Sequence, residues 1–283
     1  MLKEYCFASG KKLVLGANTC VMGILNVTPD SFSDGGRYAD ILQAVEHMQE
    51  LVQNGVGIID IGAESTRPGA KPLSVTEECA RILPALAALL PVCPVPVSVD
   101  TYHAATMEVA LKHGVDIINN VGGTFFHGET LSAAATIAAK YDAPLIVTHG
   151  GDIDSSASTD IIADIEDFFC RAEKIVVAAG LDAEKNLWLD PGIGFTGKTT
   201  TQNLQIIKHL PQLKKNSTHP LVIGASRKRF IGEVLNLPVA EREEGSLAVA
   251  AAAALARAAV IRVHDVEKTV RVCKLLDAAA NVR

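Results

Sequence analysis

The sequence predicts a single (β/α)8 barrel, an α/β fold, and three observations lead to it. The chain has 283 residues, close to the roughly 250 residues typical of one such barrel. Apolar residues make up 48% of the chain, which is enough for one large core. Short apolar runs alternate with longer amphipathic segments from end to end, as parallel strands alternate with helices. No low-complexity linker interrupts this order, so we expect one domain over residues 1–283.

Eight short runs are nearly continuous in Val, Ile and Leu, as expected for parallel strands that are covered on both faces. Eight strand–helix repeats with right-handed crossovers can close into a barrel. An open doubly wound sheet is the alternative, but the Gly-rich dinucleotide fingerprint that it predicts is absent after the first run. The runs span residues 21–27, 57–63, 95–100, 116–121, 143–148, 187–190, 220–225 and 260–264.

The segments between these runs carry apolar residues at helical spacing. Several of them stop at a glycine followed by an apolar residue, as at Gly55, Gly114 and Gly180, and glycine suits the left-handed position that ends a helix. We expect the Ala-rich segment 247–259 to be a buried helix, and the first twenty residues to cap the bottom of the barrel. The other predicted helices span 41–52, 76–90, 104–113, 130–140, 161–177, 203–210 and 266–278.

The composition argues against two classes of partner. The net charge is −6 and no basic block occurs, so nothing favours nucleic-acid binding. The most apolar stretch, 247–259, is too short to span a bilayer and contains Arg257, so we expect no membrane span. Residues 1–20 carry four charged residues and no long apolar core, so we do not expect them to act as a secretory signal. None of the six cysteines forms a C-x-x-C pair, and we therefore expect buried, reduced thiols in a cytoplasmic protein.

Every predicted strand ends in polar or glycine-rich sequence. In a barrel these ends lie on one rim and converge on one cavity. A single polar end would only reflect the polarity of loops, but eight of them, several with a charge at the last strand position, indicate a functional site. The residues at or just after the ends include Asn26, Glu64, Asp100, Asn119, Thr148, Asp190, Lys228, Arg262 and His264.

Four of these residues suit a nitrogen-rich heterocycle. Asp100 and Asp190 end apolar strands, where a carboxylate is costly unless it is satisfied. Each would either cap the next helix or accept parallel hydrogen bonds from an amidine-like edge. Asn119 would offer the same ring a donor and an acceptor, or stabilise a turn. Lys228 lies at the start of a predicted helix, where a cation is unfavourable, so a function is favoured over a solvated or ion-paired lysine.

Three further residues suit an anion and a cation. Arg262 and His264 alternate on one strand and therefore point to the same face. With the helix start after the seventh strand they form a phosphate-type anion site, although Arg262 in a structural ion pair is the alternative. The side-chain oxygen of Asn26 would suit a hard metal ion, but a lone asparagine is a weak metal signal. The loops 28–36 and 65–70 contain Pro and Gly and are expected to be mobile lids.

The motifs at these strand ends resemble those of the dihydropteroate synthase family, a group of pterin-binding enzymes of folate biosynthesis. The run MGILNVTPDSFSDGG at 22–36 is a fifteen-residue match, and DIGAESTRPG at 60–69 follows it in family order. The matches span nearly the whole chain. The remaining ones lie at 97–101, 117–119, 189–195, 224–232, 245–248 and 261–266.

The resemblance implies a transferase that joins 6-hydroxymethyl-7,8-dihydropterin diphosphate to 4-aminobenzoate and releases diphosphate. It implies Mg²⁺ as cofactor, competition by sulfonamides, small-molecule substrates as the only ligands besides the metal, and a homodimer. In the family's mechanism the C–O bond breaks early, and no dedicated general base is needed.

The resemblance also assigns roles residue by residue. The pterin diphosphate would contact Thr66, Asp100, Asn119, Asp190, Lys228, Arg262 and His264. The 4-aminobenzoate pocket would contain Thr66, Arg67, Pro68, Phe195, Ser226 and Lys228. Asn26 would bind the metal, and the catalytic set would be Asn26, Asp34, Arg67, Lys228, Arg262 and His264.

The sequence departs from the family pattern near the pterin pocket. Thr148, His149 and Gly150 replace the usual Met-His-Met, which puts the packing over one face of the pterin in doubt. Asn120 replaces an aspartate, and the run after the sixth strand is longer by one residue, at Thr196. Two other functions therefore remain open. One is a pterin-binding paralogue without activity, and the other is a methyltransferase of the related pterin-binding barrels that acts on a methylated folate.

Overall fold

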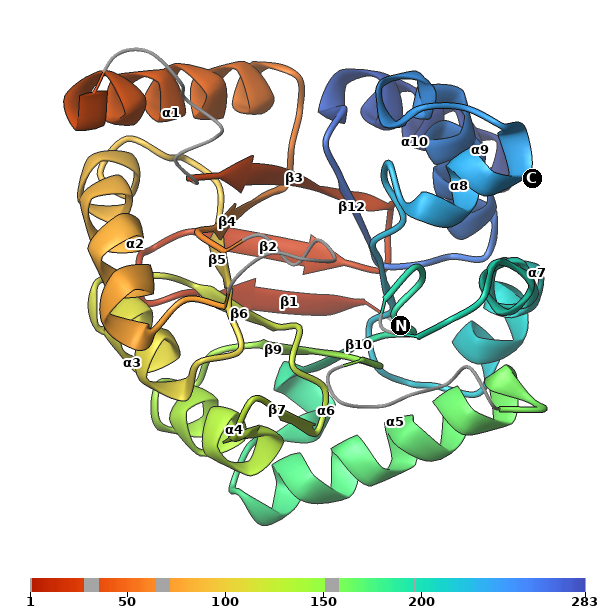
Figure 1. Ribbon diagram of the computed structural model, residues 1–283, viewed down its shortest axis with the longest axis horizontal. Coiled ribbons are helices and arrows are strands. Elements are labelled where there is room, and N and C mark those ends of the chain that lie inside the picture. Colours follow the sequence, from red (N-terminus) through yellow and green to blue (C-terminus); the bar gives the residue numbers. More distant parts are fainter. Residues whose placement is uncertain (1, 28–35, 65–71, 151–157, 196, 283) are drawn as a thin grey trace.

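The structure is a computed structural model that describes residues 2–27, 36–64, 72–150, 158–195 and 197–282, with the backbone alone for 36–40. Its main sheet has eight parallel strands in the order β10-β9-β6-β5-β4-β3-β12-β11. A parallel bridge between Leu189 and Leu221 joins the first strand of this order to the last, so the sheet closes into a barrel (Figure 1). The strands are β3 Cys20–Asn26, β4 Ile58–Gly62, β5 Val97–Asp100, β6 Ile117–Asn120, β9 Leu145–Thr148, β10 Leu187–Asp190, β11 Val222–Ile223 and β12 Val260–Val263.

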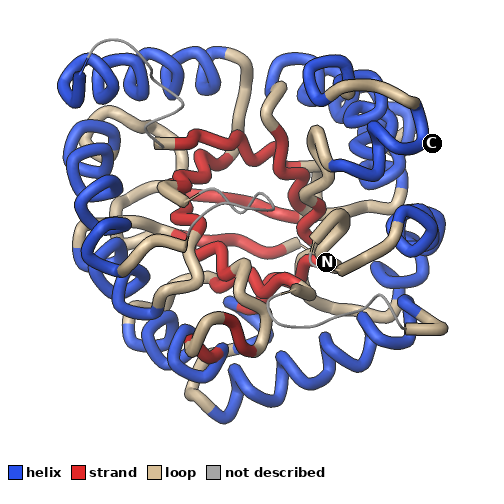
Figure 2. Tube along the Cα trace, in the orientation of Figure 1, coloured by secondary structure: helices blue, strands red, loops and turns tan. Residues whose placement is uncertain are grey.

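The helices form an outer ring around this sheet, as the tube in Figure 2 shows. Local sequence fixes several of their starts, because Ser74 and Thr199 each form a capping box with the residue three positions later. Gly55, Gly114 and Gly180 have positive φ, which confirms the predicted helix stops. The helices are α1 Gly36–Gln53, α2 Val75–Leu89, α3 Ala104–Lys112, α4 Leu131–Lys140, α5 Ile161–Ala178, α6 Ala183–Asn186, α7 Thr200–Lys215, α8 Arg229–Leu235, α9 Glu243–Leu255 and α10 Val266–Ala280.

The lower half of the barrel interior is apolar. Side chains alternate across a strand, and the inward positions at the start of each strand form a separate buried cluster around Trp188, which is fully buried. This cluster fills the barrel as a packed layer and leaves no pore. Its strand members are Met22, Ile58, Ile117, Ile146, Trp188, Val222 and Val260.

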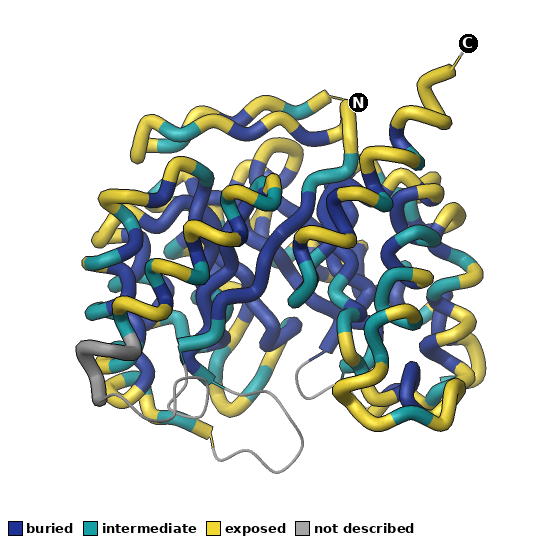
Figure 3. The backbone as a smooth tube through the Cα atoms, turned by 90° about the horizontal axis from the view of Figure 1, so that it is seen from above, coloured by how far each residue is buried: buried dark blue, intermediate teal, exposed yellow. Residues whose placement is uncertain are grey.

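The hairpin of β1 Lys3–Cys6 and β2 Lys12–Leu15 covers this layer, and Figure 3 shows it lying across one end of the barrel. Tyr5 accepts a hydrogen bond from Trp188 Nε1 at 2.9 Å, and its own hydroxyl donates to the Lys185 carbonyl. Asp116 accepts hydrogen bonds from Ser9 Oγ at 2.5 Å and from the Val97 amide at 2.9 Å. The predicted cap at the barrel bottom is therefore confirmed.

Some predictions need correction. The Ala-rich helix α9 begins at Glu243 and is buried on one side only, since Leu255 is 66% exposed. All six cysteines are unpaired, as predicted, but Cys6 and Cys170 are exposed. The short helix α6 and the short strands β7 Phe125–Phe126 and β8 Glu129–Thr130 were not predicted. The helix start predicted at Lys228 is confirmed, because α8 begins at Arg229. In the described part of the chain, no helix has the length and apolarity to cross a bilayer.

Candidate active site

The polar residues predicted at the strand ends lie together at one end of the barrel interior. On the strands that contribute to the apolar layer, they follow the residue of that layer by one or two inward-facing positions. Their registers show this directly, because Asp100 lies opposite both Gly62 and Asn119 in neighbouring strands. Asp190 lies opposite Thr148 in the same way. The carboxyl ends of the parallel strands therefore bring charged and amide groups to one end of the barrel, where the active sites of such barrels lie.

Arg262 is the centre of this group. Its Nε donates to Asp60 Oδ2 at 2.6 Å, and its Nη2 donates to Asp100 Oδ2 at 2.5 Å. Burial alone would lower the pKa of Arg262, but Asp60 and Asp100 raise it further than burial lowers it. The guanidinium therefore stays charged, and short charge-assisted hydrogen bonds hold its plane in place. The ion pair that the sequence left as an alternative for Arg262 is present.

Asp60 was missed by the sequence reasoning. It is fully buried in β4, and it also accepts a hydrogen bond from Asn119 Nδ2 at 3.1 Å. Its other oxygen has no hydrogen-bond partner within the described residues. The sequence did carry a signal, because a lone aspartate inside the apolar run 58–62 is costly without partners. Asp60 connects the Arg262 guanidinium to the Asn119 amide.

Asp100 and Asp190 have unusual titration properties. Burial raises the pKa of Asp100 to about 7, although Arg262 acts in the opposite direction. Burial likewise raises the pKa of Asp190 to about 6, against the Gly192 amide and the nearby cations. Neither residue caps a helix, because His103 and Thr199 precede α3 and α7. Two largely buried carboxylates at one end of the barrel are suited to accept hydrogen bonds from a ligand rich in N–H groups.

Lys228 and Phe195 form a second part of the site. Lys228 precedes α8 and makes no side-chain cap, and its Nζ lies 5.1 Å from the centre of the Phe195 ring. The stem of Lys228 packs on Gly194, where a Cβ would lie 2.9 Å from three of its carbons. Burial and Arg262 lower the pKa of Lys228, while Asp190 and Asp100 raise it. The ammonium is therefore near enough to both carboxylates for their charges to act on it.

The remaining predicted residues lie at the margin. His264 Nδ1 is 3.0 Å from Ser226 Oγ, so the end of β12 contacts the segment after β11. Asn26 Oδ1 and Asp100 Oδ2 both lie within 4 Å of the point where a Cβ on Gly62 would stand, at 3.4 and 3.8 Å. Asp34, Thr66, Arg67 and Pro68 lie outside the described residues, as do the two loops predicted to be lids.

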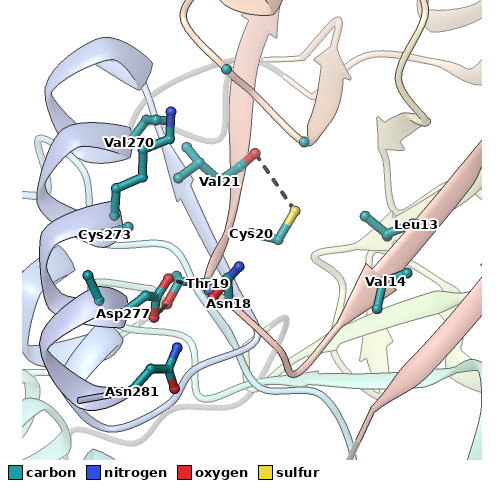
Figure 4. A pocket seen from close by; sticks show the side chains of 14 residues that line it. Leu13, Val14, Asn18, Thr19, Cys20, Val21, Val270, Cys273, Asp277 and Asn281 are labelled. Atoms are coloured by element: carbon teal, nitrogen blue, oxygen red, sulfur yellow. Dashed lines mark hydrogen bonds between the residues drawn. The ribbon is translucent and has the colours of Figure 1, made fainter.

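A groove of about 450 Å³ lies at the other end of the barrel, between β2, the start of β3 and α10 (Figure 4). Asp277 on its wall accepts hydrogen bonds from the Thr19 amide and hydroxyl. Cys20 and Cys273 also line it, and burial raises the pKa of both thiols to about 12, which makes them poor nucleophiles. The groove is separate from the polar end of the barrel.

Known proteins share this fold and these motifs. The family model described as "pterin binding enzyme" matches residues 22–264. A protein of Bacillus subtilis named dihydropteroate synthase is 42% identical over 93% of this chain and 89% of its own length. The solved structure of a Xanthomonas albilineans dihydropteroate synthase with 4-aminobenzoic acid has a TM-score of 0.90 at 35% identity and covers 100% of both chains. A Yersinia pestis dihydropteroate synthase with a sulfonamide drug has a TM-score of 0.87 at 38% identity, over 99% of this chain and 100% of its own.

This chain belongs to the dihydropteroate synthase family of pterin-binding enzymes. Its departures from the usual motifs of that family have clear positions in the structure. Asn120 points away from the cavity and holds the turn after β6, since its Oδ1 accepts from the Gly122 amide at 3.1 Å. Thr148 faces inward beside Asp190, so a small hydroxyl side chain stands where dihydropteroate synthases usually have methionine.

Gly150 has the clearest consequence among these departures. A Cβ at Gly150 would lie 2.3 Å from Phe195 Cδ1, so the Phe195 ring occupies the space that a side chain at position 150 would need. In this member of the dihydropteroate synthase family, Phe195 therefore covers the end of β9. His149 between the two substituted positions points outward, is fully buried, and has its pKa lowered to about 3 by burial and by nearby Lys198 and Arg171.

Proposed function

We propose that the chain catalyses the joining of 6-hydroxymethyl-7,8-dihydropterin diphosphate to 4-aminobenzoate, which forms 7,8-dihydropteroate and releases diphosphate. The observation that carries this proposal is the group of buried carboxylates at the carboxyl end of the barrel, in a chain of this family. The charges of Arg262 and Lys228 act on both Asp100 and Asp190, so the four residues lie together at this end. Related structures hold pteroic acid, 4-aminobenzoic acid or a sulfonamide.

The pterin binds through its aminopyrimidinone edge. The N–H groups of that edge donate to Asp190 and Asp100, and Asn119 supplies an amide to the same ring. Burial raises the pKa of both carboxylates, and hydrogen bonds from the ligand lower it again. Both are therefore ionised in the complex. Asp60 holds Arg262 and Asn119 in position and does not need to contact the pterin itself.

The leaving group binds at the margin of the same cavity. Arg262 and His264 contact the diphosphate, with Thr66, Arg67 and Asp34 from the two loops. The lone pair of the 4-aminobenzoate nitrogen attacks the exocyclic methylene carbon of the pterin, the C–O bond breaks, and its electron pair leaves with the diphosphate. The nitrogen then loses a proton to water. Fixed positive charge beside the leaving oxygens lowers the barrier, because negative charge grows there in the transition state.

One protein oxygen near the diphosphate position, that of Asn26, suits a magnesium ion. No cluster of three or more His, Cys, Asp or Glu side chains suited to a metal occurs among the described residues. Asn26 Oδ1 nevertheless points into the space beside Gly62 that Asp100 Oδ2 also reaches. A Mg²⁺ ion commonly takes one or two protein oxygens and completes its shell with phosphates and water. Asn26 would hold the ion, which would supply positive charge to the diphosphate when bound.

The second substrate binds over Phe195. Lys228, whose ammonium lies over the Phe195 ring, attracts the carboxylate of this substrate, and the Phe195 ring packs against the aromatic ring. Ser226 contributes to the pocket from the segment between β11 and Lys228. Thr66, Arg67 and Pro68 complete this pocket from the second loop. Sulfonamides compete here because they present a similar aniline ring with an acidic group opposite the nitrogen.

We further propose a cytoplasmic homodimer, with residues 1–283 of each protomer acting as one domain. The support for the dimer is an apolar outer face on the two last helices, which pack against each other. On α9, Ala248 and Leu255 are exposed, and Ala251 is half-buried. Leu275 on α10 is 70% exposed. Sedimentation should give a dimer that Leu255→Glu with Leu275→Glu converts to a monomer.

The test of the activity is diphosphate release from the pterin substrate by purified protein. We expect release that needs both 4-aminobenzoate and Mg²⁺, and product that absorbs as dihydropteroate. Pterin binding without turnover would instead favour the paralogue without activity. Methyl transfer from a methylated folate to a corrinoid or thiol, with no diphosphate release, would favour the methyltransferase.

A further inference from the structure

We propose that Lys198 is a positioning residue of the pterin site, whose buried ammonium group ties the end of β9 to the loop after β10 and places a positive charge behind the turn that holds Asp190. This inference rests on the proposed contact between Asp190 and the pterin. Lys198 ends the longer run after β10, and it is not among the residues that contact either substrate in the proposed reaction.

The position of Lys198 is unusual for a lysine. Only 5% of the residue is exposed, and its Nζ donates to the His149 carbonyl at 2.8 Å. The same Nζ lies 3.1 Å from the point where a Cβ on Gly192 would stand. The Gly192 amide donates to Asp190 Oδ1 at 2.7 Å. The ammonium group therefore lies directly behind the turn that holds the Asp190 carboxylate.

The backbone at this turn leaves little freedom. Gly192 has φ +66, and a Cβ there would lie 2.0 Å from the His149 carbonyl oxygen, so only glycine fits. The His149 amide donates to the Asp190 carbonyl at 2.8 Å. His149 thus contacts β10 through its amide and Lys198 through its carbonyl. Lys198 is therefore connected to Asp190 on two sides, through the His149 backbone and through its contact with Gly192.

The other end of the loop is fixed on α7. Asn203 Oδ1 accepts from the Gly194 amide at 2.6 Å, and its Nδ2 donates to the Thr199 carbonyl at 2.9 Å. Thr199 in turn caps α7 through a capping box with Gln202. The loop is therefore anchored on both sides of Lys198, and the lysine side chain is held in a defined direction before any ligand arrives.

A hydrogen bond to the His149 carbonyl alone does not explain a lysine here. An uncharged donor would satisfy that carbonyl, whereas a buried ammonium is costly unless opposite charges compensate it. The charges that face Lys198 are Asp190, Asp164 on α5, and Lys228 before α8. Asp190 faces Lys198, Lys228 and Arg262. Lys198 therefore lies between a carboxylate inside the barrel and one on α5.

The titration directions agree with this arrangement. Burial lowers the pKa of Lys198 to about 7, while Asp190 and Asp164 raise it. Burial raises the pKa of Asp190 to about 6, and Lys198 is one of the groups that lower it. Removing the ammonium therefore raises the pKa of Asp190, and the carboxylate is then lost to protonation at higher pH. Pterin binding should follow the ionised form of Asp190 and fail earlier as the pH falls.

The experiment measures binding of 6-hydroxymethylpterin by calorimetry between pH 5.5 and 8.5, with wild type, Lys198→Met, Lys198→Gln and Lys198→Arg. We expect the pH at which binding weakens to rise by about one unit in Lys198→Met, with about five-fold weaker binding at pH 6. Lys198→Gln keeps a donor for the His149 carbonyl without the charge and should behave like Lys198→Met. Lys198→Arg keeps the charge and should stay near wild type.

Two further variants separate charge from folding. Lys214→Met removes a half-buried lysine far from Asp190 and should leave the profile unchanged. Asp164→Asn, on a partly exposed helix face, keeps Lys198 but removes a carboxylate that favours its charge. Because neutral Lys198 no longer lowers the pKa of Asp190, the acid-side weakening of binding should begin at higher pH than in wild type, by less than in Lys198→Met. This readout remains if the uncharged Lys198 variants do not fold.

The binding profile overturns the proposal if Lys198→Met and Lys198→Gln keep the wild-type pH dependence, or if Gln restores it while Met does not. The second result would assign Lys198 to the His149 hydrogen bond alone. Because the probe carries no diphosphate, the result does not depend on turnover. Wild-type protein that binds the pterin but releases no diphosphate would contradict the proposed function and leave this inference intact.

Discussion

The two ends of the barrel interior are built from the same strands but by opposite chemistry. On β10, Trp188 faces inward in the apolar layer, and Asp190 faces inward two residues later among charged groups. At the lower end Tyr5 and the N-terminal hairpin cover the layer. At the upper end the fully buried Asp60 and the largely buried Asp100 both pair with Arg262. Stability and ligand binding should therefore depend on different residues of the same strand.

The largest expected effect is at the lower end. Trp188→Ala removes the largest buried side chain of the apolar layer and the donor to Tyr5 Oη. A truncation of this kind costs about 3–5 kcal/mol of the free energy of unfolding. Urea unfolding followed by circular dichroism measures it. A loss below about 1 kcal/mol would contradict the view that this layer stabilises the barrel.

The next largest effect compares the same substitution at two buried aspartates, Asp60 at the upper end and Asp116 at the lower end. Asp60→Asn at the upper end weakens the charge-assisted hydrogen bond that holds Arg262. We expect kcat/KM to fall about 30-fold, which corresponds to about 2 kcal/mol. Asp116→Asn is the matched change at the lower end, where the carboxylate binds Ser9, Lys11 and the Val97 amide. It should lower the free energy of unfolding and leave kcat/KM unchanged. Equal kinetic losses in both variants would remove the distinction between the ends.

Two glycines at the upper end lie beside different substrate positions, Gly150 beside Phe195 and Gly224 beside Asp190. Gly150→Ala forces the Phe195 ring to move, because the new Cβ would lie 2.3 Å from Phe195 Cδ1. The KM for 4-aminobenzoate should rise about ten-fold, a loss of about 1.4 kcal/mol. Gly224→Ala places a methyl group 3.6 Å from Asp190 Oδ2 and should weaken pterin binding instead. Steady-state kinetics with each substrate varied in turn measures both. A KM pattern shared by the two variants would contradict separate substrate positions.

The smallest effect returns to the lower end. Ser9→Ala removes one hydrogen bond from the hairpin to Asp116. It should cost about 1 kcal/mol, a fall in Tm of about 3 °C for a chain of this size. Differential scanning calorimetry measures it, and kcat should not change. A change in kcat would mean that the hairpin influences the upper end.

The sequence predicted the barrel well because its signals were local. Parallel strands such as β10 Leu187–Asp190 appear as short apolar runs, and helix ends appear as glycines with positive φ. The strand β11 Val222–Ile223 is shorter at both ends than its apolar run 220–225, because an apolar run does not show where strand pairing begins or ends. The one-sided burial of α9 was not predictable, since an alanine-rich segment gives no strong direction to a helix.

The candidate site was predicted in part. Asp100, Asn119, Asp190 and Arg262 ended strands, so position on the rim placed them together. Asp60 was missed because it lies inside a strand, and its function depends on contacts with residues far along the chain. Lys198 was missed for a similar reason, and Gly150 was recognised as a departure without its contact with Phe195. Their significance comes from contacts with His149 and Phe195, which no local pattern contains.

The most direct test of the account compares Asp190→Ala with Trp188→Ala, two inward residues of one strand. Calorimetry with 6-hydroxymethylpterin gives Kd, and urea unfolding gives the free energy of unfolding for each protein. The account predicts that Asp190→Ala weakens pterin binding at least about 100-fold and changes stability by no more than about 1 kcal/mol. Trp188→Ala should lose about 3–5 kcal/mol of stability and, below its unfolding transition, keep Kd within about three-fold of wild type. Wild-type pterin affinity in Asp190→Ala would contradict the central claim that the buried carboxylates at the upper end bind the pterin.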